Sequence, residues 1–287
     1  MISLRAMSIF SIIQSTYNNL TNTEKKVADY ILDNAEKVVY MSITDLADAC
    51  NVGESSIFRF CKSLGLKGYQ EFKIAIAHHT KVDNEIPQLN GRITTSDTID
   101  QVANKILANT VGALNETFKY LNYETLDQAV TYLQEAERIV FFGAGSSLIT
   151  ALEAKNKFMR ITNKTECPMD THFQAMSAAL LSAKDVAVII SYSGSTKDTI
   201  DVAKKAKERG ATVISITRFT KSPLTSYSDL TLLCGANEGP LQGGSTSAKI
   251  SQLYLLDVLY VEFFKRTYEQ SIINKESTAE AVIEKLL

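Results

Sequence analysis

From Arg138 onward, short apolar runs alternate with segments of helical periodicity, and this alternation restricts the fold more than any other feature of the chain. The apolar runs are residues 139–142, 186–190, 212–216 and 230–233, and the helical segments between and after them include residues 147–160, 196–209 and 248–264. Continuous apolar runs of this length are typical of strands buried on both faces of a parallel sheet. The pattern therefore predicts a doubly wound α/β domain.

The preceding part of the chain has a different pattern. Residues 1–78 show helical periodicity throughout, which predicts an all-α domain. Residues 79–97 are polar and contain few large apolar side chains, so we expect a linker there. Further helical segments lead into the α/β domain, which we place at residues 98–287 with its core at about 126–264. A chain of 287 residues is long enough for two such domains.

Within the all-α domain, residues 42–65 have the pattern of a helix-turn-helix. Ser42 is suited to cap a first helix, and Asp45 three residues later completes an approximate capping box. Asn51 stands where the turn needs a left-handed residue, a conformation that asparagine tolerates well. Gly53 then takes the N-cap position of a second helix, whose buried stripe we expect to include Ile57 and Phe60.

The polar face of that second helix is the candidate DNA-binding surface. In helix-turn-helix proteins the N-terminal residues of the second helix reach base edges in the major groove. Arg59 is placed to pair with guanine, which is worth about 1–3 kcal/mol of discrimination. We expect Lys62, Lys67 and Lys73 near phosphates. The predicted DNA-binding residues are Ser42, Glu54, Ser55, Ser56, Arg59, Lys62 and Lys67. The pattern alone also fits an ordinary helical hairpin with a solvated polar face.

Two serine-rich loops each connect a predicted strand to a predicted helix. The first, residues 143–147, contains Gly143 and Gly145, and the second, residues 191–196, has serine or threonine at four of six positions. Hydroxyls and exposed amides at the start of a helix bind phosphate without a metal or a nucleophile. A dinucleotide site is disfavoured because Leu148 replaces the third glycine of the G-x-G-x-x-G motif. A well-capped helix with additional serines is the structural alternative for the second loop.

Other side chains with possible chemical roles are weaker candidates. His172 is a candidate contact to a sugar hydroxyl, although a polar residue at a helix start is the simpler interpretation. Glu153 is a similar case on the helix after the first loop. The four cysteines are widely spaced and lack a C-x-x-C pair, so we expect free thiols rather than a zinc site or disulfides. The net charge of -2 decides nothing about nucleic acid, because a DNA-binding patch is local.

Two families resemble this chain in order along its length. Residues 20–77 resemble the N-terminal domain of RpiR-type transcriptional regulators, through L-T-x-x-E-K-K-V-A-D-Y-I, S-I-x-x-L-A-x-A-C-x-V and R-F-C-K-x-L-G-L-K-G-Y. Asn51 and Gly53 depart from the glycine and serine that the family often has at these positions. The F-G-A-G-S-S and S-x-S-G-S-T loops resemble those of the SIS (sugar isomerase) domain, over residues 126–264.

The resemblance implies a regulator of carbohydrate metabolism whose operator binding is controlled by a phosphorylated sugar. It assigns sugar phosphate contacts to Ser146, Ser147, Ser191, Ser193, Ser195 and Thr196, and we add His172. It also implies a homodimer or homotetramer on pseudo-palindromic double-stranded DNA. We expect no catalytic residue, metal or cofactor. The alternative is a sugar-phosphate isomerase or lyase on the same fold, for which Glu153 and His172 are the available bases.

The chain also lacks the signals of export or membrane insertion. No apolar run approaches the ~18 residues of a membrane-spanning helix. The N-terminus does not have the basic-then-apolar order of a secretory signal, so we expect a cytoplasmic protein without a membrane partner.

Overall fold

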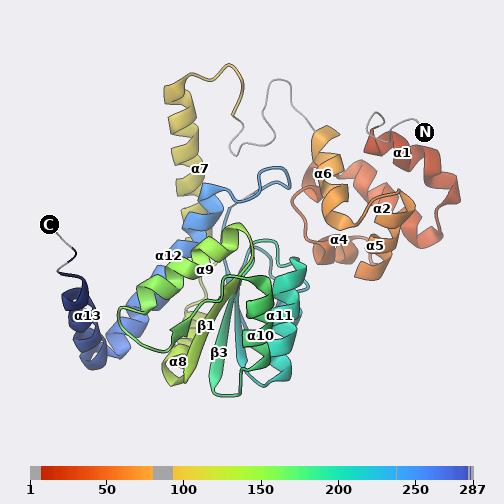
Figure 1. Ribbon diagram of the computed structural model, residues 1–287. Helices are drawn as coiled ribbons and strands as arrows, with labels where there is room; N and C mark the ends of the chain where they lie inside the picture. The colour runs from red at the N-terminus through yellow and green to blue at the C-terminus, as the bar shows by residue number, and fades with distance from the viewer. Residues whose placement is uncertain (1–7, 80–92, 237, 284, 286–287) are drawn as a thin grey trace. The chain divides into compact units, whose positions relative to one another are not determined.

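The computed structural model describes residues 8–79, 93–236, 238–283 and 285 (Figure 1). The chain divides into two compact units, residues 1–109 with 237–245, and residues 110–236 with 246–287. Most of the expected linker, residues 80–92, lies outside the described residues. At the start of the expected linker, His79 is the last residue of a helix. Near its end, the Thr94 amide donates a hydrogen bond to the Asp97 carboxylate. The expected domain limits stay a prediction.

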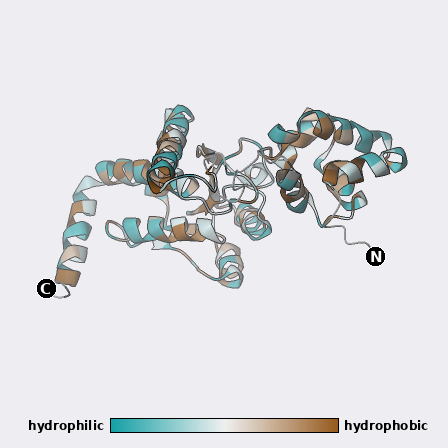
Figure 2. Cartoon of the chain, turned by 90° about the horizontal axis from the view of Figure 1, so that it is seen from above, coloured by the Kyte–Doolittle hydropathy of each residue, from teal (hydrophilic) through white to brown (hydrophobic). Residues whose placement is uncertain are grey.

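The first unit is built from short helices around one apolar core. They are α1 Ile9–Thr16, α2 Asn22–Asp33, α3 Ala35–Val38, α4 Ile43–Ala49, α5 Glu54–Ser63 and α6 Tyr69–His79, with a 3-10 turn at Tyr17–Asn19. Ile31, Leu46, Phe60 and Phe72 are fully buried in this core. Hydrophobic and hydrophilic residues occupy different sides of these helices, as Figure 2 shows. The predicted all-α N-terminal region is confirmed.

The second unit contains a five-stranded parallel sheet in the order β2-β1-β3-β4-β5. The strands are β1 Arg138–Gly143, β2 Thr165–Glu166, β3 Asp185–Ile190, β4 Thr212–Thr217 and β5 Leu230–Leu233. Four of them match the apolar runs of the sequence, and β2 was not predicted. The doubly wound α/β fold is therefore confirmed, and its strand order reverses between β1 and β3. In open sheets of this order, ligands bind outside the carboxyl ends of the strands at that reversal.

Helices cover both faces of this sheet (Figure 1). Helices α8 Tyr123–Glu135, α9 Ser146–Phe158 and α12 Thr246–Arg266 share a core with Ile139 and Phe141 of β1. Helices α10 Thr171–Ala179 and α11 Lys197–Glu208 pack with Val140 and Phe142, because successive side chains of a strand point to opposite faces. Helix α7 Ile99–Lys119 precedes this layer, and α13 Tyr268–Ile283 follows α12.

The described residues give no sign of a membrane span or a metal site. No helix in that part of the chain combines the length and hydropathy that a membrane span requires. Across the same ranges, the His, Cys, Asp and Glu side chains form no cluster of three that could hold a metal ion. All four cysteines are free thiols; Cys50, Cys61 and Cys234 are buried and Cys167 is half-buried.

Candidate nucleic-acid interface and ligand site

The helix-turn-helix consists of α4, a tight turn and α5. Ser42 and Asp45 form the expected capping box: the Asp45 amide donates to Ser42 Oγ at 3.0 Å, and the Ser42 amide donates to Asp45 Oδ2 at 3.1 Å. Asn51 has the expected left-handed backbone, with φ of 52°. Gly53 caps α5 without a side-chain hydrogen bond. The local geometry of the motif thus follows from residues that the sequence analysis singled out.

Helix α5 separates buried and exposed side chains along its length. Ile57, Phe60 and Cys61 are fully buried in the helical core. Burial raises the pKa of the Cys61 thiol to about 12, so this cysteine stays protonated at physiological pH and serves as a core residue. The exposed face carries Ser55, Arg59 and Lys62, as predicted. The Arg59 guanidinium donates to Ser56 Oγ at 3.3 Å.

The structure adds Phe58 to this exposed face. Its side chain is 45% exposed in the middle of α5, and the Lys62 ammonium lies 5.3 Å from the centre of its ring. An exposed aromatic ring beside a basic side chain gives this face an apolar group as well as positive charge. Phenylalanine in the major groove packs against the methyl group of thymine. Phe58 was not predicted, because an apolar residue next to Ile57 resembles a second core residue.

The other predicted DNA-binding residues differ in their exposure and in their hydrogen bonds. Lys67 is exposed beyond α5. Ser42 is 3% exposed and Ser56 8%, so the Ser42 hydroxyl serves first as a helix cap. The Glu54 carboxylate accepts a hydrogen bond from the Thr44 hydroxyl. These positions favour Arg59, Ser55 and the exposed lysines as the groups that face a ligand.

Lys73 was expected near a DNA phosphate, and this expectation is wrong. Its side chain is 7% exposed, and its ammonium donates to the carbonyl oxygen of Met41 at 3.0 Å. The ammonium also lies 5.8 Å from the ring centre of Tyr69, whose hydroxyl donates to the same carbonyl at 3.2 Å. Burial lowers the pKa of Lys73 to about 8, and the nearby Asp45 carboxylate partly opposes that shift. Lys73 therefore fixes the segment that enters α4.

In the second unit, the first serine loop begins where β1 ends. A side chain at Gly143 would place its Cβ 2.8 Å from the backbone of Ser147, so only glycine permits this close return of the chain. Gly145 then caps α9 with φ of 55°. Ser146 and Ser147 consequently occupy the first turn of α9, and the partial positive charge of this helix end favours an anion.

The second serine loop has the same construction after β3. Gly194 has φ of 60°, and a Cβ there would lie 2.6 Å from that of Ser222. The Ser193 hydroxyl accepts from the Ser195 amide at 3.2 Å. Thr196 is the N-cap of α11, but its side chain makes no capping hydrogen bond. The Thr196 hydroxyl is thus not used to cap α11. The loop therefore differs from the conventionally capped helix start that was the alternative to a ligand site.

The sheet brings the two loops together at one edge. Gly143 and Ile190 are partners in the parallel ladder, so the residues that follow them leave the same end of adjacent strands. The hydroxyl oxygens of Ser146 and Ser191 are both buried and have no hydrogen-bond partner among the protein atoms. An unpaired buried hydroxyl costs about 1–3 kcal/mol. One unpaired hydroxyl in each loop, at the reversal of strand order, indicates a site built for a polar ligand.

Gln174 of α10 belongs to this edge and was not predicted. Its side chain is 1% exposed, and its Nε2 donates to the carbonyl oxygen of Gly143 at 2.8 Å. Because a carbonyl only accepts, this bond fixes the orientation of the amide and leaves Oε1 buried without a partner. His172 lies in the first turn of the same helix and is exposed. Asp170 caps that turn by accepting from the His172 amide at 2.8 Å.

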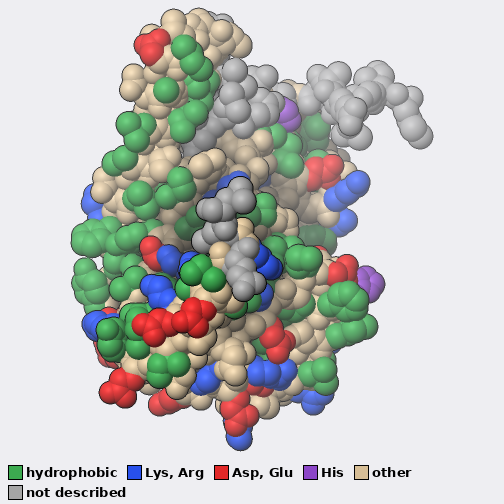
Figure 3. Space-filling model, turned by 60° about the vertical axis from the view of Figure 1, so that its left-hand side comes forward, with side chains coloured by type: hydrophobic (Ala, Val, Ile, Leu, Met, Phe, Trp, Pro, Cys, Tyr) green, Lys and Arg blue, Asp and Glu red, His purple; other side chains and the backbone are tan. Residues whose placement is uncertain are grey.

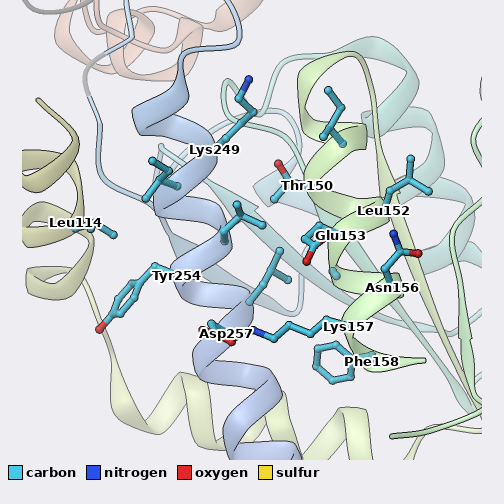
Figure 4. Close-up of a pocket in the computed structure, with 15 residues that line it drawn as sticks. Leu114, Thr150, Leu152, Glu153, Asn156, Lys157, Phe158, Lys249, Tyr254 and Asp257 are labelled. Atoms are coloured by element: carbon cyan, nitrogen blue, oxygen red, sulfur yellow. Dashed lines mark hydrogen bonds and ion pairs between the residues drawn. The ribbon is translucent and has the colours of Figure 1, made fainter. Parts of the chain in front are cut away.

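A separate cavity of about 640 Å³ lies along α9 and α12 (Figure 4). Its lining is mainly apolar and includes Leu114, Ile149 and Tyr254, but no residue of the two serine loops. Figure 4 shows the Lys157 ammonium turned towards Asp257, with which it forms an ion pair. Glu153 also lines this cavity, which separates it from the phosphate-binding candidates.

Comparisons with known proteins agree with both halves of the molecule. The family model described as a helix-turn-helix domain of the rpiR family matches residues 7–82, and that of the SIS domain matches residues 132–262. An HTH-type transcriptional regulator from Haemophilus influenzae is 36% identical over 279 residues, which cover 96% of this chain and 97% of that protein. The HTH-type transcriptional regulator HexR of Pseudomonas aeruginosa is 35% identical over 247 residues, 86% of each chain.

Solved structures give the same result. The Vibrio vulnificus NanR protein, complexed with ManNAc-6P, superposes with a TM-score of 0.86 at 31% identity and covers 97% of this chain and 100% of its own. The sugar isomerase domain of an RpiR transcription factor from Sphaerobacter thermophilus superposes with a TM-score of 0.58 at 20% identity. It covers 63% of this chain and 99% of its own, and it supports the fold alone.

Proposed function

This chain belongs to the RpiR family of helix-turn-helix transcriptional regulators, and on that premise we propose that a phosphorylated sugar bound at its serine loops controls its binding to operator DNA. The observation that carries the proposal is the pair of buried, unpartnered hydroxyls at Ser146 and Ser191. They lie on neighbouring loops at the carboxyl edge of the sheet, where doubly wound folds bind ligands.

The chemistry of the loops suits a phosphate monoester. Its oxygens accept hydrogen bonds, and the loops offer the hydroxyls of Ser146, Ser191 and Thr196 at the N-terminal ends of α9 and α11. The partial positive charge at two helix N-termini favours the dianion. Ser147, Ser193 and Ser195 complete this set, and His172 is a further candidate contact to the sugar. A sugar phosphate is then an effector, and the proposal requires no cofactor.

On the DNA side, we assign base contact to the exposed face of α5. Arg59 provides a bidentate donor for guanine, and Phe58 provides an apolar contact for thymine. Lys62 and Lys67 are exposed and are assigned to phosphates. Each phosphate contact neutralised by one lysine adds about 0.9 to the slope of log affinity against log salt concentration.

A homodimer would present two such helices to a pseudo-palindromic operator. Helix α7 exposes Ile106, Leu107, Val111 and Phe118. Figure 3 views one side of the molecule and shows hydrophobic side chains on its surface. Exposed apolar patches of this kind mark protein interfaces. Two-fold symmetry places the half-sites one helical turn, ~34–36 Å, or a multiple of it apart.

An isomerase is the competing function for a SIS fold. That chemistry needs a base beside the substrate carbonyl. Glu153 lines the cavity on α9 and α12 rather than the serine loops, and the relatives described above carry the names of transcriptional regulators. His172 is assigned above to contact with the sugar, and we assign no catalytic residue.

Fluorescence anisotropy on DNA from upstream of the protein's own gene cluster tests the proposal. The full chain is titrated at physiological salt with competitor DNA, and then a panel of sugar phosphates is added, beginning with ManNAc-6P. We expect specific binding that one sugar phosphate shifts by about 5–150-fold. Specific binding that no member of the panel alters would contradict effector control while leaving the regulator intact.

Matched variants separate the two activities. Ser191→Ala removes an unpartnered hydroxyl and is expected to abolish the response to the effector while DNA affinity without effector stays unchanged. Ser226→Ala, an exposed serine outside both loops, is the control and keeps the response. A normal response in Ser191→Ala would place the phosphate elsewhere.

A further inference from the structure

The second serine loop carries one aromatic residue, Tyr192, which the proposed phosphate site does not use. Its hydroxyl donates to the carbonyl oxygen of Ala236 at 2.7 Å. Its own carbonyl accepts twice, from the Arg218 amide at 3.0 Å and from the Thr217 hydroxyl at 3.1 Å. Tyr192 therefore ties the loop to the chain that leaves β4 and to the chain that leaves β5.

The other end of this network is helix α7. The Arg218 guanidinium donates to Glu116 Oε1 at 2.8 Å and to the Tyr120 hydroxyl at 3.1 Å. The second carboxylate oxygen of Glu116 accepts from the Ala236 amide at 3.1 Å. Burial alone would raise the pKa of Glu116, but the hydrogen bonds from Ala236, Tyr120 and Arg218 outweigh it, and the pKa is lowered. Glu116 is thus held as a carboxylate between the two segments that Tyr192 contacts.

The exit of β5 is also packed closely against α7. Gly235 lies so near this helix that a Cβ there would be 2.6 Å from the carbonyl oxygen of Ala113. The Gly235 amide donates to the Thr117 hydroxyl at 2.8 Å. Both Ala113 and Thr117 are buried. A movement of residues 235–236 therefore has to be accompanied by a movement of α7.

Ala236 has a strained backbone that the network maintains. Its φ is 120°, a conformation that an L side chain rarely adopts, and the residue is 3% exposed. Such strain persists only where the surroundings hold the residue in place. Here Glu116 accepts from its amide and Tyr192 donates to its carbonyl. Loss of either hydrogen bond removes part of what holds the strained form, so this segment is suited to two arrangements.

The hydrogen-bond network of Tyr192, Arg218 and Glu116 involves segments through which the chain passes from one unit to the other. The chain passes between the two units at three places, after residues 109, 236 and 245. The first lies on α7, which contains Glu116, and the second directly follows Ala236. Two of the three passages are therefore linked by hydrogen bonds, within the second unit, to the loop that carries Ser191 and Ser193.

We propose that Tyr192, together with Arg218 and Glu116, transmits occupancy of the serine loops to the segments that connect the two units. This inference rests on the proposed function, since it assigns a route to the effector's control of DNA binding. A ligand that engages the loop hydroxyls biases the position of Tyr192 and thereby the hydrogen bonds of Ala236 and Arg218. A route of this kind requires an element with two arrangements that both sites bias.

Hydrogen exchange on the full chain tests the route. Amide exchange is measured in residues 191–196 and in residues 110–119, with inorganic phosphate or ManNAc-6P raised until exchange in 191–196 no longer changes. In the unaltered chain we expect both segments to respond. In Tyr192→Phe, which lacks only the hydroxyl that donates to Ala236, residues 191–196 still respond and the response of 110–119 falls about five-fold or more.

Two further variants complete the design. Tyr132→Phe removes a hydroxyl on α8 that accepts from the Gln128 side-chain amide, and it is expected to keep both responses. Glu116→Gln keeps the side chain's shape and tests the same route if Tyr192→Phe folds poorly. An unchanged response of 110–119 in Tyr192→Phe or in Glu116→Gln would overturn the proposed route. A response confined to 191–196 in the unaltered chain would overturn the route and leave the phosphate site standing, whereas no response in 191–196 would remove both.

Discussion

The side-chain amide of Gln174 donates to the carbonyl oxygen of Gly143 at 2.8 Å and joins α10 to the end of β1. Gln174→Leu keeps the approximate volume but leaves this carbonyl without its side-chain donor. An unpaired buried carbonyl costs about 1–3 kcal/mol, but the variant also removes the buried, unpartnered Oε1 of Gln174, so we expect the free energy of unfolding to fall by about 1 kcal/mol. Urea unfolding followed by circular dichroism measures it.

The control for Gln174 is Gln128→Leu, at an exposed position on α8. Its stability should stay within about 0.5 kcal/mol of the unaltered chain. If the two variants lose the same stability, the contact to Gly143 contributes nothing specific to the fold at this edge.

Phe58→Ala is expected to weaken operator binding without unfolding the first unit. Its ring is 45% exposed, so its removal leaves no cavity in the helical core. If the ring packs against a thymine methyl, the preference for thymine at that position should fall, at most by the cost of one mismatched base pair, about 1–3 kcal/mol. Anisotropy titrations against operators substituted at single positions measure this change. Equal weakening on every sequence would contradict base contact and indicate a general loss of affinity.

The sequence predicted those features that depend on local periodicity. The stripe of Ile57, Phe60 and Cys61 follows from helical spacing, and the left-handed Asn51 follows from its place in the turn. The strands β1 and β3 were evident because strands buried on both faces are continuously apolar.

The missed features depend on contacts between distant residues. β2 has two residues, too few for any period to appear. Gln174 is buried on α10 while Phe173 and Met176 are exposed, the reverse of what hydropathy predicts. Lys73 is buried because Met41, 32 residues earlier in the chain, offers its carbonyl.

Asp185 is expected to make the second unit sensitive to acid. Burial alone would raise the pKa of this carboxyl, but hydrogen bonds from Arg138 and from Ser182 outweigh it, and the pKa is lowered. A carboxylate with a lowered pKa stabilises the fold above its unfolded pKa, and that stability is lost as the pH falls through the folded pKa. The unaltered chain should therefore lose stability below about pH 4.

Asp185→Asn isolates this contribution. It removes the partner of Arg138, which lies 2.9 Å away and has a side chain 35% exposed. Breaking a fully buried pair costs about 3–5 kcal/mol, and the partial exposure of Arg138 reduces our expectation to about 2 kcal/mol at neutral pH. Urea unfolding at several pH values should show a shallower acid decline in the variant. A decline of the same steepness in both proteins would assign the acid sensitivity to other carboxylates.

Lys73 predicts a pH dependence of the same sign in the first unit, but in the alkaline range. Its folded pKa is about 8, below the ordinary value of 10.5. Between these two values the unfolded chain binds more protons, so this residue's contribution to stability rises with pH across that window. Lys73→Met removes the titration while Tyr69 continues to donate to the Met41 carbonyl. The difference in unfolding free energy, unaltered chain minus variant, should therefore increase between pH 8 and pH 10. Taking the difference cancels the buried thiols of Cys50 and Cys61, which titrate in both proteins. A difference that stays constant over this range would mean that Lys73 is charged in its buried position at every pH tested.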